Sequence, residues 1–214
     1  MKLWGGRFSD GIAKSAELLS RSVDFDYRLA KYDIAVNLVH VRSLEQNGVI
    51  EKAESEKIQK ALKKIGQEIV AGNLKINESD EDIHSVIERR MIEELPDLGS
   101  VIRTGRSRND LVATDFKLYL MESMNTVALS LSQLANVVNE QAISMAKVIA
   151  PGFTHTQHAQ PISFGQEIAK HAQSFTRDLT RITDWLNRNS ISPFGAAALA
   201  GSQFNPSPEA AAKS

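Results

Sequence analysis

The sequence predicts an all-α protein, with a small helical N-terminal domain followed by the long helices of a central bundle. Apolar residues recur at steps of three and four through most of the 214 residues, and no segment of useful length alternates with the period of a strand. Neither proline nor glycine occurs between residues 107 and 150. We expect the N-terminal domain to span residues 1–105 and the start of the bundle domain to span residues 106–214.

The first hundred residues predict an irregular arm and three helices. Residues 1–9 form the arm, because Gly5-Gly6 disfavours regular structure. Apolar periodicity predicts a helix over residues 27–46, which ends at Asn47-Gly48, and a second helix over residues 52–70. A third helix is predicted over residues 83–95, behind an acidic run that suits the positive end of a helix.

A single helix is predicted from about residue 107 to residue 150. Its apolar positions repeat at steps of four and three, as in a heptad pattern; they are Leu120, Met124, Val127, Leu131, Leu134 and Val138. Such a helix would be roughly 65 Å long, whereas a compact chain of this size has a diameter of about 45 Å. Other copies of the same helix would cover the apolar stripe, so the sequence predicts a homo-oligomer with a helical bundle at its centre.

A polar bend over residues 151–161 separates this helix from the next one. It combines Pro-Gly with two histidines, two threonines and two glutamines. Pro161 suits the first turn of a following helix, which we expect to reach about Asn187. Residues 192–214 are rich in Ala, Gly, Pro and Ser and predict a loop.

The bulk composition limits the kinds of partner. The formal net charge is -1 and the pI is about 6.5, so no global field attracts nucleic acid or an anionic membrane. Cysteine is absent, which excludes disulfides and thiolate chemistry. No apolar run approaches the ~20 residues that span a bilayer. We therefore expect a cytoplasmic protein that binds neither nucleic acid nor membrane.

The turn before the long helix, from Thr104 to Asp110, is the first candidate site. Arg106 and Arg108 could bind a carboxylate or phosphate beside the exposed N–H groups of a helix N-terminus, with Ser107 and Asn109 as further polar groups. The same residues are typical of a capped helix with a solvated basic turn, and local features alone favour that interpretation.

The bend is the second candidate site. His155 and His158, with Glu167 and His171 on the next helix, suggest a zinc site, but their spacing matches no known metal motif. An acid–base histidine among hydroxyl and amide donors fits this stretch better.

A third cluster, from Asp80 to His84, combines carboxylates with a histidine. By itself it predicts a solvated acidic helix start.

Taken together and in order, these stretches resemble argininosuccinate lyase. The resemblance is carried by Trp4-Gly-Gly-Arg-Phe8, Asp80-Glu-Asp-Ile-His84 and Thr104-Gly-Arg-Ser-Arg-Asn-Asp110, followed by Pro151-Gly-Phe-Thr-His-Thr-Gln157 and Ser192-Pro-Phe-Gly195. It covers nearly the whole chain. The Thr-His element is shared more widely in the fumarase/aspartase superfamily, whereas the run from Thr104 to Asp110 is specific.

The resemblance implies a helical homotetramer in which each active site takes segments from three subunits. The implied reaction is the reversible elimination of arginine from argininosuccinate to give fumarate, without a metal or organic cofactor. It needs a base, an acid and donors that stabilise a carbanion. The implied roles are an acid–base histidine, His155; substrate contacts from Ser22, Ser107, Arg108, Asn109, Thr154 and Gln157; and support from Asp82, His84 and Arg106.

The chain departs from the family pattern at several points. Arg103 and Gln166 stand where the family more often has histidine, and Ala196-Ala197 replace a more usual Ser-Gly. Family members also continue for about as many residues again and carry a serine loop whose signature does not occur here. We therefore expect an N-terminal part of the enzyme that is inactive alone. The alternatives are another fumarate-releasing lyase of the superfamily, or a catalytically silent, crystallin-like assembly.

Overall fold

The computed structural model describes residues 13–204. It divides the chain into two units, one made of Met1–Tyr119 with Ile191–Ser214 and the other of Leu120–Ser190. Helices dominate both units, so the predicted all-α class is confirmed. The expected arm at residues 1–9 and the last ten residues of the expected loop lie outside the described residues. The domain boundary between residues 105 and 106 stays a prediction.

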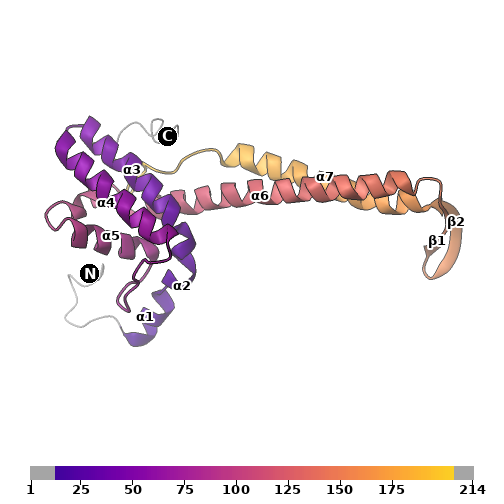
Figure 1. Ribbon diagram of the computed structural model, residues 1–214, viewed down its shortest axis with the longest axis horizontal. Helices are drawn as coiled ribbons and strands as arrows, with labels where there is room; N and C mark the ends of the chain where they lie inside the picture. The colour runs from indigo at the N-terminus through magenta and orange to yellow at the C-terminus, as the bar shows by residue number, and fades with distance from the viewer. Residues whose placement is uncertain (1–12, 205–214) are drawn as a thin grey trace. The chain divides into compact units, whose positions relative to one another are not determined.

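The first unit consists of short helices around three longer ones. The short elements are α1 (Lys14–Ser20), α2 (Val23–Asp26) and two 3₁₀ helices, Tyr27–Leu29 and Gly99–Arg103. The longer helices are α3 (Ala30–Gln46), α4 (Lys52–Val70) and α5 (Ile83–Glu94), which pack against one another (Figure 1). The predicted helices over residues 27–46, 52–70 and 83–95 are therefore present, with a 3₁₀ turn at the start of the first.

Local capping explains where α4 and α5 begin. Glu51 and Glu54 form a reciprocal capping box at the start of α4. At α5 the Asp82 carboxylate accepts the Ser85 N–H at 2.7 Å, while the Ser85 hydroxyl accepts the Asp82 N–H at 3.1 Å. Such boxes satisfy backbone donors that a helix start leaves without partners.

Buried aliphatic side chains from α3, α4 and α5 form the core of the first unit. On α4 the buried Ile58, Leu62 and Ile65 follow the steps of four and three that place residues on one helix face. Ile83, Ile87 and Met91 of α5 meet them and are fully buried. Burying a side chain of this size contributes about 1.5–3 kcal/mol, so this core holds the segments that carry the polar site.

The segment after residue 190 belongs to the same unit. Phe194 packs with Val36 and Leu111, and its ring meets the His40 ring edge-on at 5.6 Å between centroids. The Lys117 ammonium donates to the Ile191 carbonyl at 2.6 Å. These contacts hold the predicted loop against the first turns of α6 (Arg108–Ser144).

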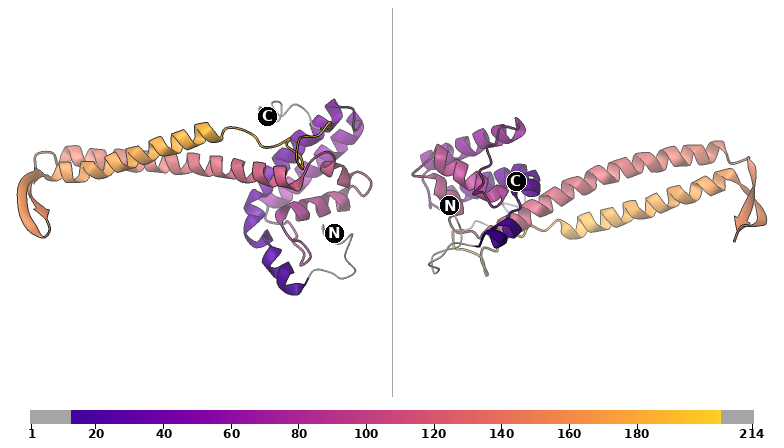
Figure 2. Two further views of the ribbon diagram at one scale, coloured as in Figure 1. Left: turned by 180° about the vertical axis from the view of Figure 1, so that it is seen from behind. Right: turned by 90° about the horizontal axis from the view of Figure 1, so that it is seen from below.

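The second unit contains most of α6, a two-stranded hairpin and α7 (Phe164–Asn189). The hairpin pairs β1 (Ile149–Thr154) with β2 (Gln157–Ser163) in antiparallel fashion and connects the two helices in every view (Figure 2).

The sequence reading missed this hairpin. It expected the long helix to continue to residue 150, whereas α6 ends at Ser144, and it placed Pro161 in the first turn of a helix, whereas Pro161 lies in β2. Pro151, Gly152 and Pro161 interrupt the alternation of short strands, which is why the period-two signal is absent.

Gly152 allows the two strands to approach closely. The register shifts between Pro151 and Phe153, and a Cβ at position 152 would lie 2.5 Å from the Gln160 carbonyl oxygen. Glycine at a bulge is the usual solution to such an approach.

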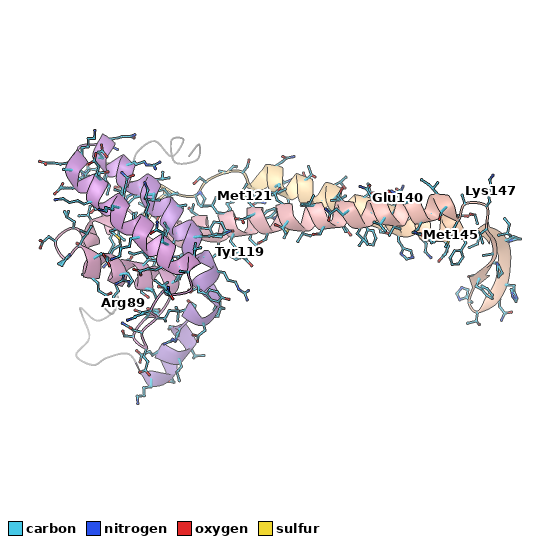
Figure 3. All side chains as sticks on the ribbon, viewed as in Figure 1. Arg89, Tyr119, Met121, Glu140, Met145 and Lys147 are labelled. Carbon is cyan, nitrogen blue, oxygen red and sulfur yellow. The ribbon has the colours of Figure 1, made fainter. Side chains whose placement is uncertain are left out.

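Many apolar side chains of the second unit are exposed. Figure 3 shows side chains that stand clear of α6 along its length, among them Glu140, and labels Met145 just after the helix ends. Among the described residues of this unit, the large hydrophobic side chains that are exposed are Val127, Leu129, Leu134, Val137, Ile143, Val148, Ile149, Phe153 and Phe164. An apolar surface of this kind marks an interaction site.

Across residues 13–204, no helix combines the length and the apolar character that crossing a membrane requires.

Candidate functional site

Ser22 lies beside the N-terminal end of α5. Its hydroxyl donates to the Asp26 carboxylate at 2.6 Å, and its N–H donates to the Glu81 carbonyl at 2.8 Å. The other Asp26 oxygen accepts the Ile83 N–H at 3.0 Å. Burial raises the pKa of Asp26, against the hydrogen bonds from Ser22 and Ile83. The predicted contact residue Ser22 is therefore attached to the first turn of α5.

Arg108 links the N-terminal ends of α5 and α6. One guanidinium nitrogen donates to both carboxylate oxygens of Asp82, at 2.9 and 3.1 Å, and another donates to Glu88 at 2.9 Å. The three side chains are between 15% and 20% exposed, so the cluster contacts solvent at its edge. Charge-assisted hydrogen bonds of this kind are shorter and stronger than neutral ones.

Ser107 caps α6. Its hydroxyl accepts the Asn109 N–H at 3.2 Å, and the Asp110 carboxylate accepts the Ser107 N–H at 3.2 Å, so side chains satisfy two backbone donors at the start of the helix. Asn109 is exposed at this end of the helix. The other Asp110 oxygen accepts the N–H groups of Gly195 and Ala197, at 3.2 and 2.8 Å. The Asp110 carboxylate therefore hydrogen-bonds both to the start of α6 and to the loop that contains Gly195 and Ala197.

Arg106 points into the interior of the first unit. Gly105 before it has a φ of +68°, a conformation that glycine adopts without strain. The Arg106 side chain is only 3% exposed, donates to the Asn37 amide oxygen at 2.7 Å and lies 3.9 Å from Glu88. The capped-helix reading thus holds for Ser107, but the basic turn is not simply solvated, because Arg106 is buried and Arg108 is paired.

His84 is buried against two aspartates. Its Nδ1 lies 2.5 Å from an Asp33 oxygen and 3.6 Å from an Asp115 oxygen. Burial lowers the pKa of His84, but the hydrogen bond and charge of Asp33 and the charge of Asp82 outweigh it, so the pKa is raised.

The cluster from Asp80 to His84 was expected to form a solvated acidic helix start. The structure instead buries its histidine. Asp80 is also buried, and Arg89 pairs with both of its oxygens.

The second candidate site occupies the tip of the hairpin. Thr154 pairs with Gln157 across a two-residue turn, and the central residues His155 and Thr156 have φ values of +49° and +63°. Two positive φ angles are typical of a type I′ turn, which usually contains glycine or asparagine. A β-branched residue at positive φ is a strained exception, and such strain clusters at functional sites. Thr154, His155 and Gln157 are all exposed.

The structure brings together most of the predicted residues of the first unit. Contacts connect Ser22, through Asp26 and the α5 start, to Asp82 and Arg108, and place His84 and Arg106 in the buried layer beneath. Thr154, His155 and Gln157 belong to the second unit and gather at one turn.

Sequence reasoning missed five polar residues of the first unit that contact the predicted ones: Asp26, Asp33, Asn37, Glu88 and Asp115. A signal existed for two of them, because Asp33, Asn37 and His40 are spaced by four and three along the apolar face of α3 and are all buried. Burial and the charge of Arg106 lower the pKa of His40 to about 4. Polar groups on a buried helix face require partners.

The residues that depart from the family pattern differ in their contacts and exposure. Arg103 approaches Glu88 at 4.0 Å, and Gln166 is exposed on α7. Ala197 has a φ of +53°, in the region that favours glycine.

The chain also matches a known protein family. The profile of the family described as "Lyase" matches residues 6–214. The chain belongs to this lyase family.

Curated relatives of the chain show which enzyme of this family it resembles. The chain is 43% identical, over 99% of its length, to an argininosuccinate lyase of Frankia casuarinae, and 42% identical, over 96%, to one of Caldanaerobacter subterraneus subsp. tengcongensis. It covers 46% of each of these two relatives, so it spans about half the length of the curated relatives it matches. The predicted resemblance to argininosuccinate lyase is confirmed.

Solved structures share the fold. An EDDS lyase in complex with formate superposes with a TM-score of 0.76 at 21% identity, over 86% of this chain and 36% of the other. A class II fumarase from Schistosoma mansoni gives a TM-score of 0.70 at 20% identity, over 94% of this chain and 47% of the other. At these identities the likeness concerns the fold alone.

Proposed function

We propose that the protein containing this chain is an argininosuccinate lyase, which reversibly eliminates arginine from argininosuccinate to give fumarate. The observation that carries the proposal is the pairing of Arg108, at the start of α6, with two carboxylates of the α5 segment: Asp82 at its N-cap and Glu88 within the helix. The alignment with argininosuccinate lyases over nearly the whole chain supports it.

The first unit would hold the carboxylates of the substrate. The N-terminus of α6 presents backbone N–H groups and the positive end of the helix dipole, with Ser107 and Asn109 beside it. A guanidinium has five N–H donors, so Arg108 can donate to a substrate carboxylate while Asp82 and Glu88 hold the guanidinium in place. Ser22 would contribute a hydroxyl at the α5 end.

The hairpin would supply the proton transfer. His155 is exposed at a tight turn, flanked by Thr154 and Gln157, which offer a hydroxyl and an amide to a substrate. The elimination needs a proton removed from carbon and a proton delivered to the leaving guanidino group, and a positioned histidine can perform one of these transfers. Neither step calls for a metal or an organic cofactor.

The exposed apolar residues of α6 support a homo-oligomer. Val127 and Leu134 belong to the predicted stripe and are exposed in the single chain. Partner copies of this chain would cover the stripe, and a homotetramer in the cytoplasm fits the proposed enzyme.

Substrate selectivity tests the proposal. The full-length protein that contains this chain, purified from a host that lacks its own argininosuccinate lyase, is given argininosuccinate, adenylosuccinate or aspartate, and fumarate is followed by its ultraviolet absorbance. We expect fumarate from argininosuccinate alone. Release from either of the other substrates would assign a different lyase of the superfamily, and no release from any of the three would favour a silent structural assembly.

A further inference from the structure

The buried layer beneath the first candidate site contains a carboxyl group without hydrogen-bond partners. Asp115, on the buried face of α6, has no solvent exposure, and neither of its oxygens receives a hydrogen bond. One of these oxygens lies within 4.8 Å of both a carboxylate oxygen of Asp33 and a ring nitrogen of His84. An isolated carboxylate in such surroundings costs far more free energy than a neutral carboxyl group.

The charges around Asp115 are already balanced without it. Arg106 and Arg108, together with His84 when its ring is protonated, face three carboxylates, Glu88, Asp82 and Asp33. Asp110, on the same helix, is satisfied separately by three backbone N–H groups. A negative charge on Asp115 would therefore be a fourth one near three cations.

Hydrogen bonding indicates where the proton belongs. Asp33 accepts from the Asn37 amide at 2.5 Å and faces His84 Nδ1 at 2.5 Å, so its charge is well stabilised. Asp115 has no such donors, and its closest approach to His84 is 3.6 Å. Two carboxyl groups that share one site cannot both ionise readily, and the group with fewer donors keeps the proton.

We propose that Asp115 carries a proton in the folded chain and acts as a positioning residue, which leaves Asp33 as the single charged acceptor that orients His84 and the first turn of α5. Its protonation does not depend on the proposed reaction; only the use of that orientation in catalysis rests on the proposed function. Burial, and then the charge of Asp33, raise the pKa of Asp115 against the effect of Arg106, in agreement with this assignment.

A divalent cation among the same three residues fits less well. The 2.5 Å contact between Asp33 and His84 leaves room for a proton rather than a metal ion between them. Arg106 also places a buried positive charge next to the cluster. The cluster therefore suits a shared proton better than a bound cation.

The sign of the pH effect distinguishes a neutral from an ionised Asp115. A raised pKa in the folded state means that the folded chain keeps a proton that the unfolded chain has lost above about pH 4, so wild-type stability falls as the pH rises. The asparagine of Asp115→Asn has nearly the same shape as aspartate but does not titrate. The fall in stability with rising pH that Asp115 causes is therefore absent in this variant. Contributions from His84, Asp33, Arg106 and Asp110 are common to both proteins and largely cancel in the difference.

The experiment measures Tm of the protein as encoded, in wild-type form and as Asp115→Asn, from about pH 5 to about pH 9. We expect the Tm of Asp115→Asn minus that of the wild type to increase with pH by at least about 5 °C. A difference that decreases with pH would show an ionised Asp115 and overturn the proposal. Asp33→Asn is the matched control, and we expect it to lower Tm at every pH, because it removes the charged acceptor.

Infrared spectroscopy provides a second readout that does not depend on the unfolding transition. The wild-type minus Asp115→Asn difference spectrum at neutral pH should contain the C=O band of a protonated carboxyl group. Carboxylate bands in its place would overturn the proposal. A rise in wild-type Tm on adding zinc, absent in Asp115→Asn, would instead assign the cluster to a cation and also overturn it.

Discussion

His155 occupies a backbone position that few residues adopt. Its φ of +49°, followed by +63° at Thr156, places the imidazole at the tip of the turn, and the Thr156 hydroxyl donates to the His155 carbonyl at 2.6 Å. A strained turn of this kind persists where the surrounding structure imposes it. The residue that the sequence selects for chemistry is therefore also one of the three described non-glycine residues at positive φ.

Replacement of this histidine tests its proposed role. We expect His155→Gln to lower kcat for argininosuccinate cleavage by about 10²–10⁴-fold, because a positioned acid–base group contributes that much. The matched control is His158→Gln on the same hairpin, whose ring stacks on Phe153 at 4.7 Å. It should reduce kcat by less than tenfold, and equal losses in the two variants would assign the effect to the hairpin rather than to proton transfer.

Ala197 provides a stability prediction at a single residue. Its φ of +53° costs an alanine about 1–2 kcal/mol, and its N–H donates to Asp110, which prevents the backbone from relaxing. Ala197→Gly should therefore stabilise the chain by about 0.5–1 kcal/mol after the entropic cost of glycine. Thermal unfolding measures this change. Ala198→Gly, next to it and without a positive φ, should give no gain.

At the scale of elements, capping and apolar periodicity determine most of the helices. The boundaries of α4 match the predicted residues, because the Glu51–Glu54 box and an apolar stripe with steps of four and three both lie within the segment. The hairpin follows no such local rule, because the pairing of its strands is interrupted by a shift of register at Gly152.

The hairpin depends on this glycine. In Gly152→Ala the added Cβ would meet the Gln160 carbonyl oxygen at 2.5 Å, so we expect the pairing of β1 with β2 to weaken and kcat to fall with it. Hydrogen exchange of residues 149–163, followed by mass spectrometry, measures the pairing. Ala159→Ser, at an exposed position of β2, is the control. Unchanged exchange in Gly152→Ala would contradict the proposed need for a close approach.

At the scale of the whole molecule, the two units differ in how they bury apolar surface. The first unit encloses a continuous core between α3, α4 and α5. Along the second unit the largest buried side chains are alanines, Ala135, Ala142 and Ala172, whereas the larger apolar residues include many that are exposed. The stability of the second unit should therefore depend on association.

Association can be tested on the α6 stripe. Leu134→Glu places a charge in the expected interface, so we expect the association constant of the oligomer to fall at least tenfold, since burying a leucine contributes about 1.5–3 kcal/mol. Sedimentation velocity over a range of concentrations measures it. Asn139→Glu adds the same charge at an exposed polar position and should leave the oligomer intact. A wild-type protein that sediments as a monomer would contradict the oligomer itself.

The sequence by itself determined most of the helices, the all-α class and the likeness to argininosuccinate lyase, and it indicated two polar stretches as candidate sites. Periodicity, capping residues and ordered motifs are local, so neighbouring residues suffice to show them. The tertiary structure alone decided that His84 is buried between Asp33 and Asp115, that Arg106 points inward and that Arg108 is paired. The partners of these charges come from segments far apart in the chain, and their ionisation depends on burial, which no local pattern records.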